Sequence, residues 1–199
     1  MLRIEGLVKK YGKFTAVDRL DMHVSKGSIF GFVGPNGAGK TTTMKIMAGL
    51  MTADEGKVFI DDMDVSRNSD LLKQRIGYMP DFFGVYSDLR VDEYMDFFAG
   101  AYYIPYEQRA EIIDNLLELV DLSHKDGLSR GMKQRLCLAR SLIHDPDILI
   151  LDEPASGLDP RARVEMKEIL KQLSTLNKTI IISSHILPEL AEMCTEIGI

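Results

Sequence analysis

Residues 34–42 have the residue types and spacing of a loop that binds a nucleoside triphosphate. The pattern G-x-x-x-x-G-K-[ST] is filled by Gly34, Pro35, Asn36, Gly37, Ala38, Gly39, Lys40, Thr41 and Thr42. Its glycines let backbone N–H groups surround the phosphates, Lys40 reaches the outer phosphates, and the hydroxyl of Thr41 is a ligand for Mg²⁺. An apolar segment at 29–33 precedes this phosphate loop and a helical segment at 43–47 follows it, which is the context that the motif requires. We therefore expect the chain to bind a nucleoside triphosphate.

Two adjacent carboxylates follow a second apolar segment. Asp152 and Glu153 come directly after Ile148–Leu151. At the end of a buried strand, Asp152 can bind Mg²⁺, directly or through water, and Glu153 can polarise an attacking water molecule. The structural alternative is that the two carboxylates only cap the element that follows. A phosphate loop upstream in the same chain favours the catalytic interpretation.

His185 stands after a third apolar segment, at the end of Ile182-Ser183-Ser184-His185. A histidine in this position often serves only as a cap or packs in the core. If the three strands are parallel neighbours, however, their carboxyl ends share one crevice, which is the usual ligand side of an open parallel sheet. An imidazole there could donate a hydrogen bond to the γ-phosphate, so His185 is a candidate catalytic residue.

The pattern of apolar residues predicts an α/β fold with a mostly parallel sheet. Strands are expected at about 2–7, 17–24, 28–33, 57–61, 75–79, 147–152 and 178–184. Helices are expected at about 40–50, 91–102, 107–120, 131–143, 160–175 and 187–194. The early strands alternate, which suits a sheet with one wet face, whereas the later ones are apolar throughout and are expected to be central parallel strands. A single domain over residues 1–199 accounts for the whole pattern.

Composition excludes several classes of function. A net charge of −6 and a pI near 5.3 argue against a nucleic-acid-binding face. Cys137 and Cys194 lack a C-x-x-C spacing, which favours a reduced compartment. The longest apolar run, Phe97 to Ile104, has eight residues, far fewer than the roughly 18 of a membrane span, and the first residues are not typical of a signal peptide. Any connection to a membrane is expected to come through another chain.

In their order, the motifs resemble those of the ATP-binding cassette family, the nucleotide-hydrolysing subunits of ABC transporters. The segment 128–135, with Ser129 and Gly131, resembles the signature sequence that separates this family from other phosphate-loop ATPases. Residues 156–159 resemble its D-loop. Tyr11, expected in a loop between early strands, looks like the aromatic residue that stacks on adenine. The alternative for Tyr11 is a turn residue that covers a sheet edge.

The same resemblance assigns Asp152 and Glu153 as the metal-binding and catalytic carboxylates, and His185 as the switch histidine. It implies a phosphate-loop NTPase core, an N-terminal antiparallel β subdomain and a small α-helical subdomain at about 82–140. ATP and Mg²⁺ are the implied cofactors. The helix that opens at the signature sequence would bind the ATP of an opposite subunit. The implied partners are therefore a second ATPase subunit, identical or different, and a separate membrane subunit, with no nucleic acid.

Three residues depart from the common family pattern. Arg130 and Met132 replace a glycine and a glutamine of the signature, a variant found in exporter-like members, so the resemblance points to export. Asp81 stands where the family usually carries a glutamine that senses Mg²⁺ and the membrane subunit. Asp81 either binds the metal through water or caps the following turn.

Two further departures concern length. The connector at 123–127, before the signature, is shorter than in most family members, and the chain stops at residues 196–199, within what looks like another strand. Both features predict that residues are missing, and the C-terminal end is expected to be truncated.

Aromatic residues are concentrated in the helical subdomain. They are Phe82, Phe83, Tyr86, Tyr94, Phe97, Phe98, Tyr102, Tyr103 and Tyr106. Some are expected to pack the subdomain, while others can anchor a partner. The best surface candidates for docking the membrane subunit are Phe82, Phe83, Val85 and Tyr86.

The expected function is that of an exporter ATPase subunit, peripheral on the cytoplasmic face of the cell membrane, that couples ATP-driven dimer closure to transport. The alternative is a soluble ABC-type ATPase that acts on a macromolecular assembly. Only 95 positions separate Gly34 from Ser129, which leaves no room for the long coiled coil of DNA-repair members. Translation-type members carry two cassettes, whereas this chain carries one.

Overall fold

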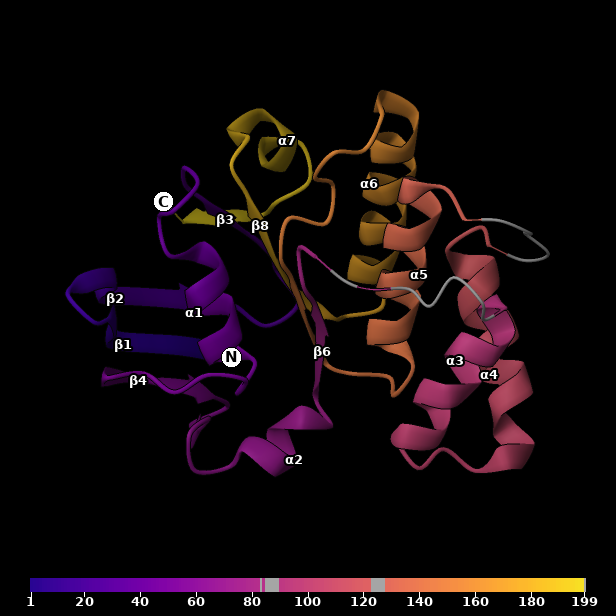
Figure 1. Ribbon diagram of the computed structural model, residues 1–199, viewed down its shortest axis with the longest axis horizontal. Helices are drawn as coiled ribbons and strands as arrows, with labels where there is room; N and C mark the ends of the chain where they lie inside the picture. The colour runs from indigo at the N-terminus through magenta and orange to yellow at the C-terminus, as the bar shows by residue number, and fades with distance from the viewer. Residues whose placement is uncertain (83, 85–89, 123–127, 199) are drawn as a thin grey trace.

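The computed structural model of the chain describes residues 1–82, 84, 90–122 and 128–198, and it contains two sheets flanked by helices (Figure 1). The antiparallel sheet has the order β2-β1-β4-β5, from β1 (Leu2–Tyr11), β2 (Phe14–Val24), β4 (Glu55–Ile60) and β5 (Met63–Asp64). The parallel sheet has the order β6-β7-β8-β3-β9, from β3 (Ile29–Val33), β6 (Ile76–Met79), β7 (Ile148–Leu151), β8 (Thr179–Ser184) and β9 (Glu196–Gly198). The helices are α1 (Lys40–Met47), α2 (Ser69–Lys73), α3 (Val91–Ala101), α4 (Tyr106–Leu119), α5 (Arg130–Leu142), α6 (Pro160–Thr175) and α7 (Leu187–Ala191).

The parallel sheet is buried on both faces. Ile148 and Ile150 of β7 pack in one apolar core with α1 and the antiparallel sheet. Leu149 and Leu151, which alternate with them, pack in a second core with α5 and α6. Figure 1 shows these layers in succession, with the antiparallel sheet and α1 on one side of the parallel strands and α5 with α6 on the other. Strands covered on both faces are apolar throughout, which confirms the α/β fold predicted from the sequence.

The first two strands form a longer hairpin than the sequence pattern indicated. Tyr11 pairs with Phe14 across a turn at Gly12 and Lys13. Gly12 has a φ of 59°, in the left-handed region that glycine adopts readily. The prediction that Tyr11 lies in a loop was therefore wrong, because the tight turn extends the paired strands to Tyr11 itself.

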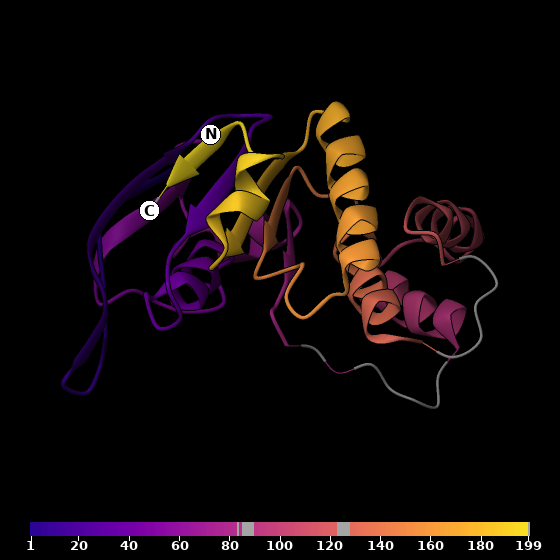
Figure 2. The ribbon, with the colours of Figure 1, turned by 90° about the horizontal axis from the view of Figure 1, so that it is seen from above.

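Helices α3 and α4 form a pair beside α5, at the end of the molecule farthest from the antiparallel sheet (Figure 2). Tyr94 of α3 is buried and packs on Phe98, with ring centroids 5.0 Å apart. Other aromatic side chains of the cluster are exposed, namely those of Phe82, Phe97, Tyr102, Tyr103 and Tyr106. The cluster thus divides into residues that pack the helical pair and residues on its surface.

Several sequence-based expectations fall outside the described residues. These are the docking candidates Phe83, Val85 and Tyr86 and the short connector at 123–127. Among the helices of the described ranges, none has both the length and the apolar character needed to cross a bilayer.

Candidate active site

Four neighbouring parallel strands bring the predicted residues to one edge of the sheet. Asp81 follows β6, Glu153 follows β7, His185 follows β8, and the phosphate loop follows β3. Ligands bind at this edge in open parallel sheets. A cavity of about 350 Å³ opens here, and it is lined by Tyr11, Phe14, Ala16, Asn36, Gly37, Gly39, Lys40, Thr41, Thr42, Asp81, Glu153, Ser156 and His185.

The backbone of the phosphate loop depends on its glycines. Gly37 and Gly39 both have a φ of 84°, and Gly39 is the N-cap of α1. A Cβ atom at Gly39 would overlap the carbonyl oxygen of Ala16, so only glycine lets the loop approach β2 this closely. The first N–H groups of α1 have no intrahelical partner and carry the positive end of the helix dipole. The loop therefore presents a site that favours an anion.

Lys40 is fixed between the phosphate loop and a catalytic carboxylate candidate. Its side chain is only 7% exposed. Its Nζ donates to the carbonyl oxygens of Gly34, at 2.7 Å, and Pro35, at 3.1 Å. The same atom lies 3.4 Å from Oε1 of Glu153. A buried ammonium group needs partners of this kind, and phosphate oxygens in the cavity would be stronger ones.

Asp152 is fully buried and offers one free oxygen. Its Oδ1 accepts a hydrogen bond of 2.7 Å from Oγ of Ser183. The same Oγ accepts a hydrogen bond of 2.9 Å from the backbone N–H of Glu153. Its Oδ2 has no hydrogen-bond partner in the described part of the chain. A buried, unsatisfied carboxylate oxygen fits a hard cation such as Mg²⁺, which prefers oxygen ligands.

Glu153 has a strained backbone, and its carboxylate contacts both Lys40 and His185. Its φ is 50°, in the left-handed region that costs a non-glycine residue energy and that occurs at functional sites. Its Oε2 is joined to Nδ1 of His185 by a hydrogen bond of 2.8 Å, while Oε1 faces Lys40. Lys40, Glu153 and His185 thus form one chain of charge-assisted contacts along the cavity. The sequence predicted that these residues meet but did not predict that His185 bonds directly to Glu153.

Asp81 lies close to the other acidic residues of the site. Burial raises the pKa of its carboxyl, and the charges of Asp152 and Glu153 raise it further, while Arg130 and His185 act in the opposite direction. In the part of the chain that the structure describes, its side chain caps no backbone N–H. A bound cation would offset the repulsion between these carboxylates.

Tyr11 and Phe14 form the aromatic wall of the cavity. They pair across the β1–β2 turn, and their side chains are 48% and 60% exposed. The hydroxyl of Tyr11 is 3.2 Å from Sδ of Met51, which steadies the ring. Phe14 was not predicted as a site residue. Its signal in the sequence is the tight turn at Gly12 and Lys13, which sets Phe14 opposite Tyr11.

The signature residues lie outside this cavity. Ser129 is the N-cap of α5, and its Oγ accepts a hydrogen bond of 3.3 Å from the backbone N–H of Met132. Neither Ser129 nor Gly131 lines the cavity. The structure therefore brings together the phosphate loop, Asp81, Glu153 and His185 within one chain, but it leaves the signature apart from them.

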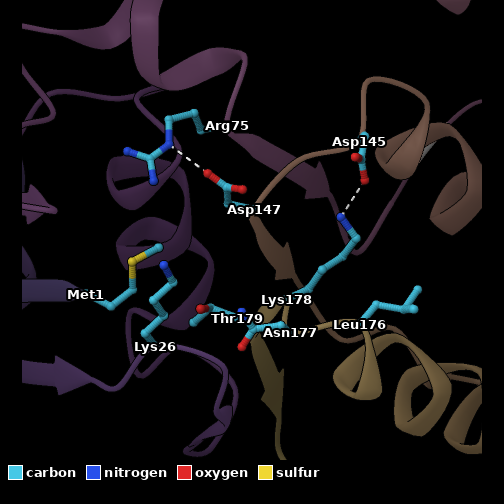
Figure 3. A pocket seen from close by; sticks show the side chains of 9 residues that line it. All are labelled: Met1, Lys26, Arg75, Asp145, Asp147, Leu176, Asn177, Lys178 and Thr179. Carbon is cyan, nitrogen blue, oxygen red and sulfur yellow. Dashed lines mark hydrogen bonds and ion pairs between the residues drawn. The ribbon is translucent and has the colours of Figure 1, made fainter.

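A larger pocket, of about 410 Å³, lies at the opposite edge of the parallel sheet (Figure 3). Four of its charged side chains form two ion pairs. Arg75 Nε is 2.9 Å from Asp147 Oδ2, and Lys178 Nζ is 2.7 Å from Asp145 Oδ1. Volume alone does not identify the functional site, because the residues suited to phosphate chemistry line the smaller cavity.

The strand, loop and helix from β3 to α1, with two carboxylates at the end of β7, define a phosphate-loop NTPase. Residues 17–156 match the sequence profile of the family described as ABC transporter. The chain belongs to the ABC transporter family.

Similar proteins carry names from transport and resistance. The chain is 40% identical to the probable multidrug ABC transporter ATP-binding protein YbhF of Escherichia coli, over 100% of its own length and 35% of the relative's. It is 38% identical to the Nod factor export ATP-binding protein I of Ralstonia nicotianae, over 99% of its own length and 63% of the relative's. It is 34% identical to the linearmycin resistance ATP-binding protein LnrL of Bacillus subtilis, over 100% of its own length and 66% of the relative's. The chain thus spans from about a third to two thirds of these proteins.

Solved structures show the same fold. A structure titled as the ATP binding subunit of an ABC transporter superposes with a TM-score of 0.84 and 26% identity, covering 98% of this chain and 84% of that one. The dimeric bacterial ABC transporter cassette MJ0796 superposes with a TM-score of 0.88 and 24% identity, covering 99% of this chain and 93% of that one.

Proposed function

We propose that this chain is the ATP-binding and ATP-hydrolysing subunit of an ABC transporter of the exporter branch. The observation that carries the proposal is the contact chain Lys40–Glu153–His185 at the mouth of the phosphate loop. It puts a fixed cation for the phosphates beside a carboxylate that can accept a proton. Residues 1–199 would form one such cassette, with the helical subdomain at about 82–140.

Each residue of the site has a role in this proposal. The N–H groups of the phosphate loop and Lys40 bind and orient the phosphates. Tyr11 stacks on the adenine ring, a contact worth roughly 1–3 kcal/mol. Glu153 accepts a proton from the attacking water, and its bond to His185 holds Oε2 in place. Thr41, Asp152 and Asp81 would hold Mg²⁺, which would offset the negative charge of the phosphate oxygens.

The proposal requires two ATPase chains, identical or different. Ser129 and Gly131 open α5, whose first N–H groups form an anion site, yet they do not line the cavity of their own chain. We propose that they bind the ATP held by a second subunit. Closure of the dimer around two ATP molecules would then provide the movement that is passed to a membrane subunit.

The membrane subunit is proposed as a separate chain, so this subunit would be peripheral on the cytoplasmic face of the membrane. The exposed Phe82, with the neighbouring docking candidates Phe83, Val85 and Tyr86, would belong to the surface that meets it. The relatives are named for multidrug transport, Nod factor export and linearmycin resistance, which supports export as the direction of transport.

Phosphate release from MgATP tests the enzymatic part of the proposal. The isolated chain should hydrolyse ATP. When it is instead purified from cells that also express the membrane protein encoded beside its gene, the two proteins should co-purify. A folded chain that releases no phosphate from MgATP would contradict the proposed activity. Hydrolysis together with capture of a soluble assembly, and no membrane partner, would instead support the alternative of a soluble ABC-type ATPase.

Replacing Asp81 by alanine should raise the Mg²⁺ concentration required for hydrolysis and leave metal-free nucleotide binding unchanged. The reason is that Asp81 faces Asp152 and Glu153, where an oxygen ligand could reach the metal through water. Asp81→Gln is the matched control, because it keeps a ligating oxygen without the charge, and its Mg²⁺ requirement should lie closer to the parent's. Titration of activity with Mg²⁺ measures the effect. If Asp81→Ala has the parent's Mg²⁺ dependence, Asp81 has no role at the metal.

A further inference from the structure

We propose that Arg130 positions the segment 156–159 for hydrolysis; this inference rests on the function proposed above. Arg130 is the first residue of α5, directly after the N-cap Ser129. Its guanidinium covers the backbone of Gly157. A Cβ atom added at Gly157 would overlap Cζ and Nη2 of Arg130 and lie 2.6 Å from Nη1. The guanidinium therefore occupies the space where any other residue at 157 would place its side chain.

Gly157 favours this contact for two separate reasons. Its φ is 63°, a left-handed conformation that side chains disfavour. Its missing Cβ also leaves the space that the guanidinium fills. The two reasons can be separated by experiment, because only the second depends on Arg130.

Further contacts join the same two parts of the chain. Nε2 of Gln134, a residue that is 4% exposed, donates 3.1 Å to the carbonyl oxygen of Ser156. A Cβ atom at Gly131 would lie 3.0 Å from Cβ of Ala162, so α5 also packs closely on the start of α6. Segments 129–134 and 156–162 therefore form one packed unit.

This unit connects the two surfaces of the proposed dimer site. Ser129 is at the signature end, and Ser156 lines the nucleotide cavity of its own chain. Arg130 does not line the cavity, although its charge lowers the pKa of Asp81, which does. The contact of its guanidinium with Gly157 reaches the reaction through Gly157 and Ser156. We expect Arg130 to affect kcat more strongly than the affinity for ATP.

The planar shape of Arg130 matters more than its charge in this contact. Among the described residues, its guanidinium makes no hydrogen bond or ion pair, and it lies against a backbone that carries no net charge. A lysine would keep the charge but would lose the flat face. Arg130→Lys should therefore resemble Arg130→Ala in kcat.

A double-mutant cycle between Arg130 and Gly157 tests the inference. Steady-state hydrolysis of MgATP is measured for the parent, Arg130→Ala, Gly157→Ala and the double variant, with circular dichroism to confirm that each is folded. Gly157→Ala should lower kcat about tenfold or more in the parent, because the added methyl group displaces the guanidinium from the segment. It should lower kcat only about threefold when Arg130 is already alanine, because there is then no guanidinium to displace. KM for ATP should change little in any of the variants.

Each outcome of the cycle has a defined meaning. The same fold-change from Gly157→Ala in both backgrounds would overturn the positioning role of Arg130. Full kcat in Arg130→Lys, with a loss in Arg130→Ala, would also overturn it, since charge alone would then suffice. A parent protein that is folded but releases no phosphate would contradict the proposed function itself, and thermal unfolding of the four variants would then still report whether the two residues are coupled.

Discussion

Substitution of Lys40 by alanine should strongly weaken MgATP binding and reduce turnover even more. Lys40 supplies the buried cation that contacts two carbonyl oxygens of the phosphate loop and faces Glu153. Hydrogen bonds to charged groups are worth roughly 1.5–3 kcal/mol. Loss of the hydrogen bond from Lys40 to the phosphates should therefore weaken MgATP binding by about 10- to 100-fold. Turnover should fall further, because negative charge shifts toward the leaving phosphate in the transition state and would lose a stabilising cation. Isothermal titration calorimetry measures the loss of affinity directly.

Two control variants isolate the role of the charge at Lys40. Lys40→Met keeps a side chain of similar length without the ammonium group and should behave like Lys40→Ala. Lys57→Ala removes an exposed lysine of β4 that does not line the cavity, and it should bind MgATP as the parent does. Unchanged MgATP affinity in Lys40→Ala would show that the phosphate loop has been assigned wrongly.

Glu153→Gln should stop hydrolysis while ATP continues to bind. Glutamine keeps the shape of the side chain and can still hydrogen-bond to His185, but it cannot accept the proton of the attacking water. General-base assistance is typically worth about 10²- to 10⁴-fold, and turnover should fall by that order. The affinity for ATP should remain within a few-fold of the parent's. Phosphate release and nucleotide binding, measured on the same preparation, separate the two effects.

The matched control for this variant is Glu168→Gln, which removes an exposed carboxylate on α6. Among the described residues, its one ion pair is with Lys171, at 3.8 Å. Its turnover should equal the parent's. If Glu153→Gln hydrolyses ATP as fast as Glu168→Gln, Glu153 is not the general base. In that case its strained backbone and its contacts with Lys40 and His185 would need another explanation.

The parts of the site that the sequence predicted are those encoded by contiguous residues. The phosphate loop lies within nine positions, and Asp152 and Glu153 directly follow an apolar strand, so spacing alone identified them. The α/β fold followed from strands that are apolar throughout, because only strands covered on both faces have that pattern.

Other features depend on contacts that sequence spacing does not encode. The Oγ of Ser183 joins Asp152 to the backbone of Glu153 across a distance of about thirty residues in the chain. The contact of Arg130 with Gly157 likewise depends on how α5 packs against the segment before α6. The short elements α2 and β5 were not predicted, because five and two residues are too few to show a period. These features are products of tertiary packing.

The central claim is that the signature of one chain completes the nucleotide site of another, and sedimentation of the Glu153→Gln variant tests it most directly. This variant should hold ATP without hydrolysing it, so the ATP-bound state should accumulate. We predict that it sediments as a monomer without nucleotide and as a dimer with MgATP, and that Ser129→Ala added to the same variant weakens the dimer. A Glu153→Gln protein that is saturated with MgATP and remains strictly monomeric would contradict the two-chain site.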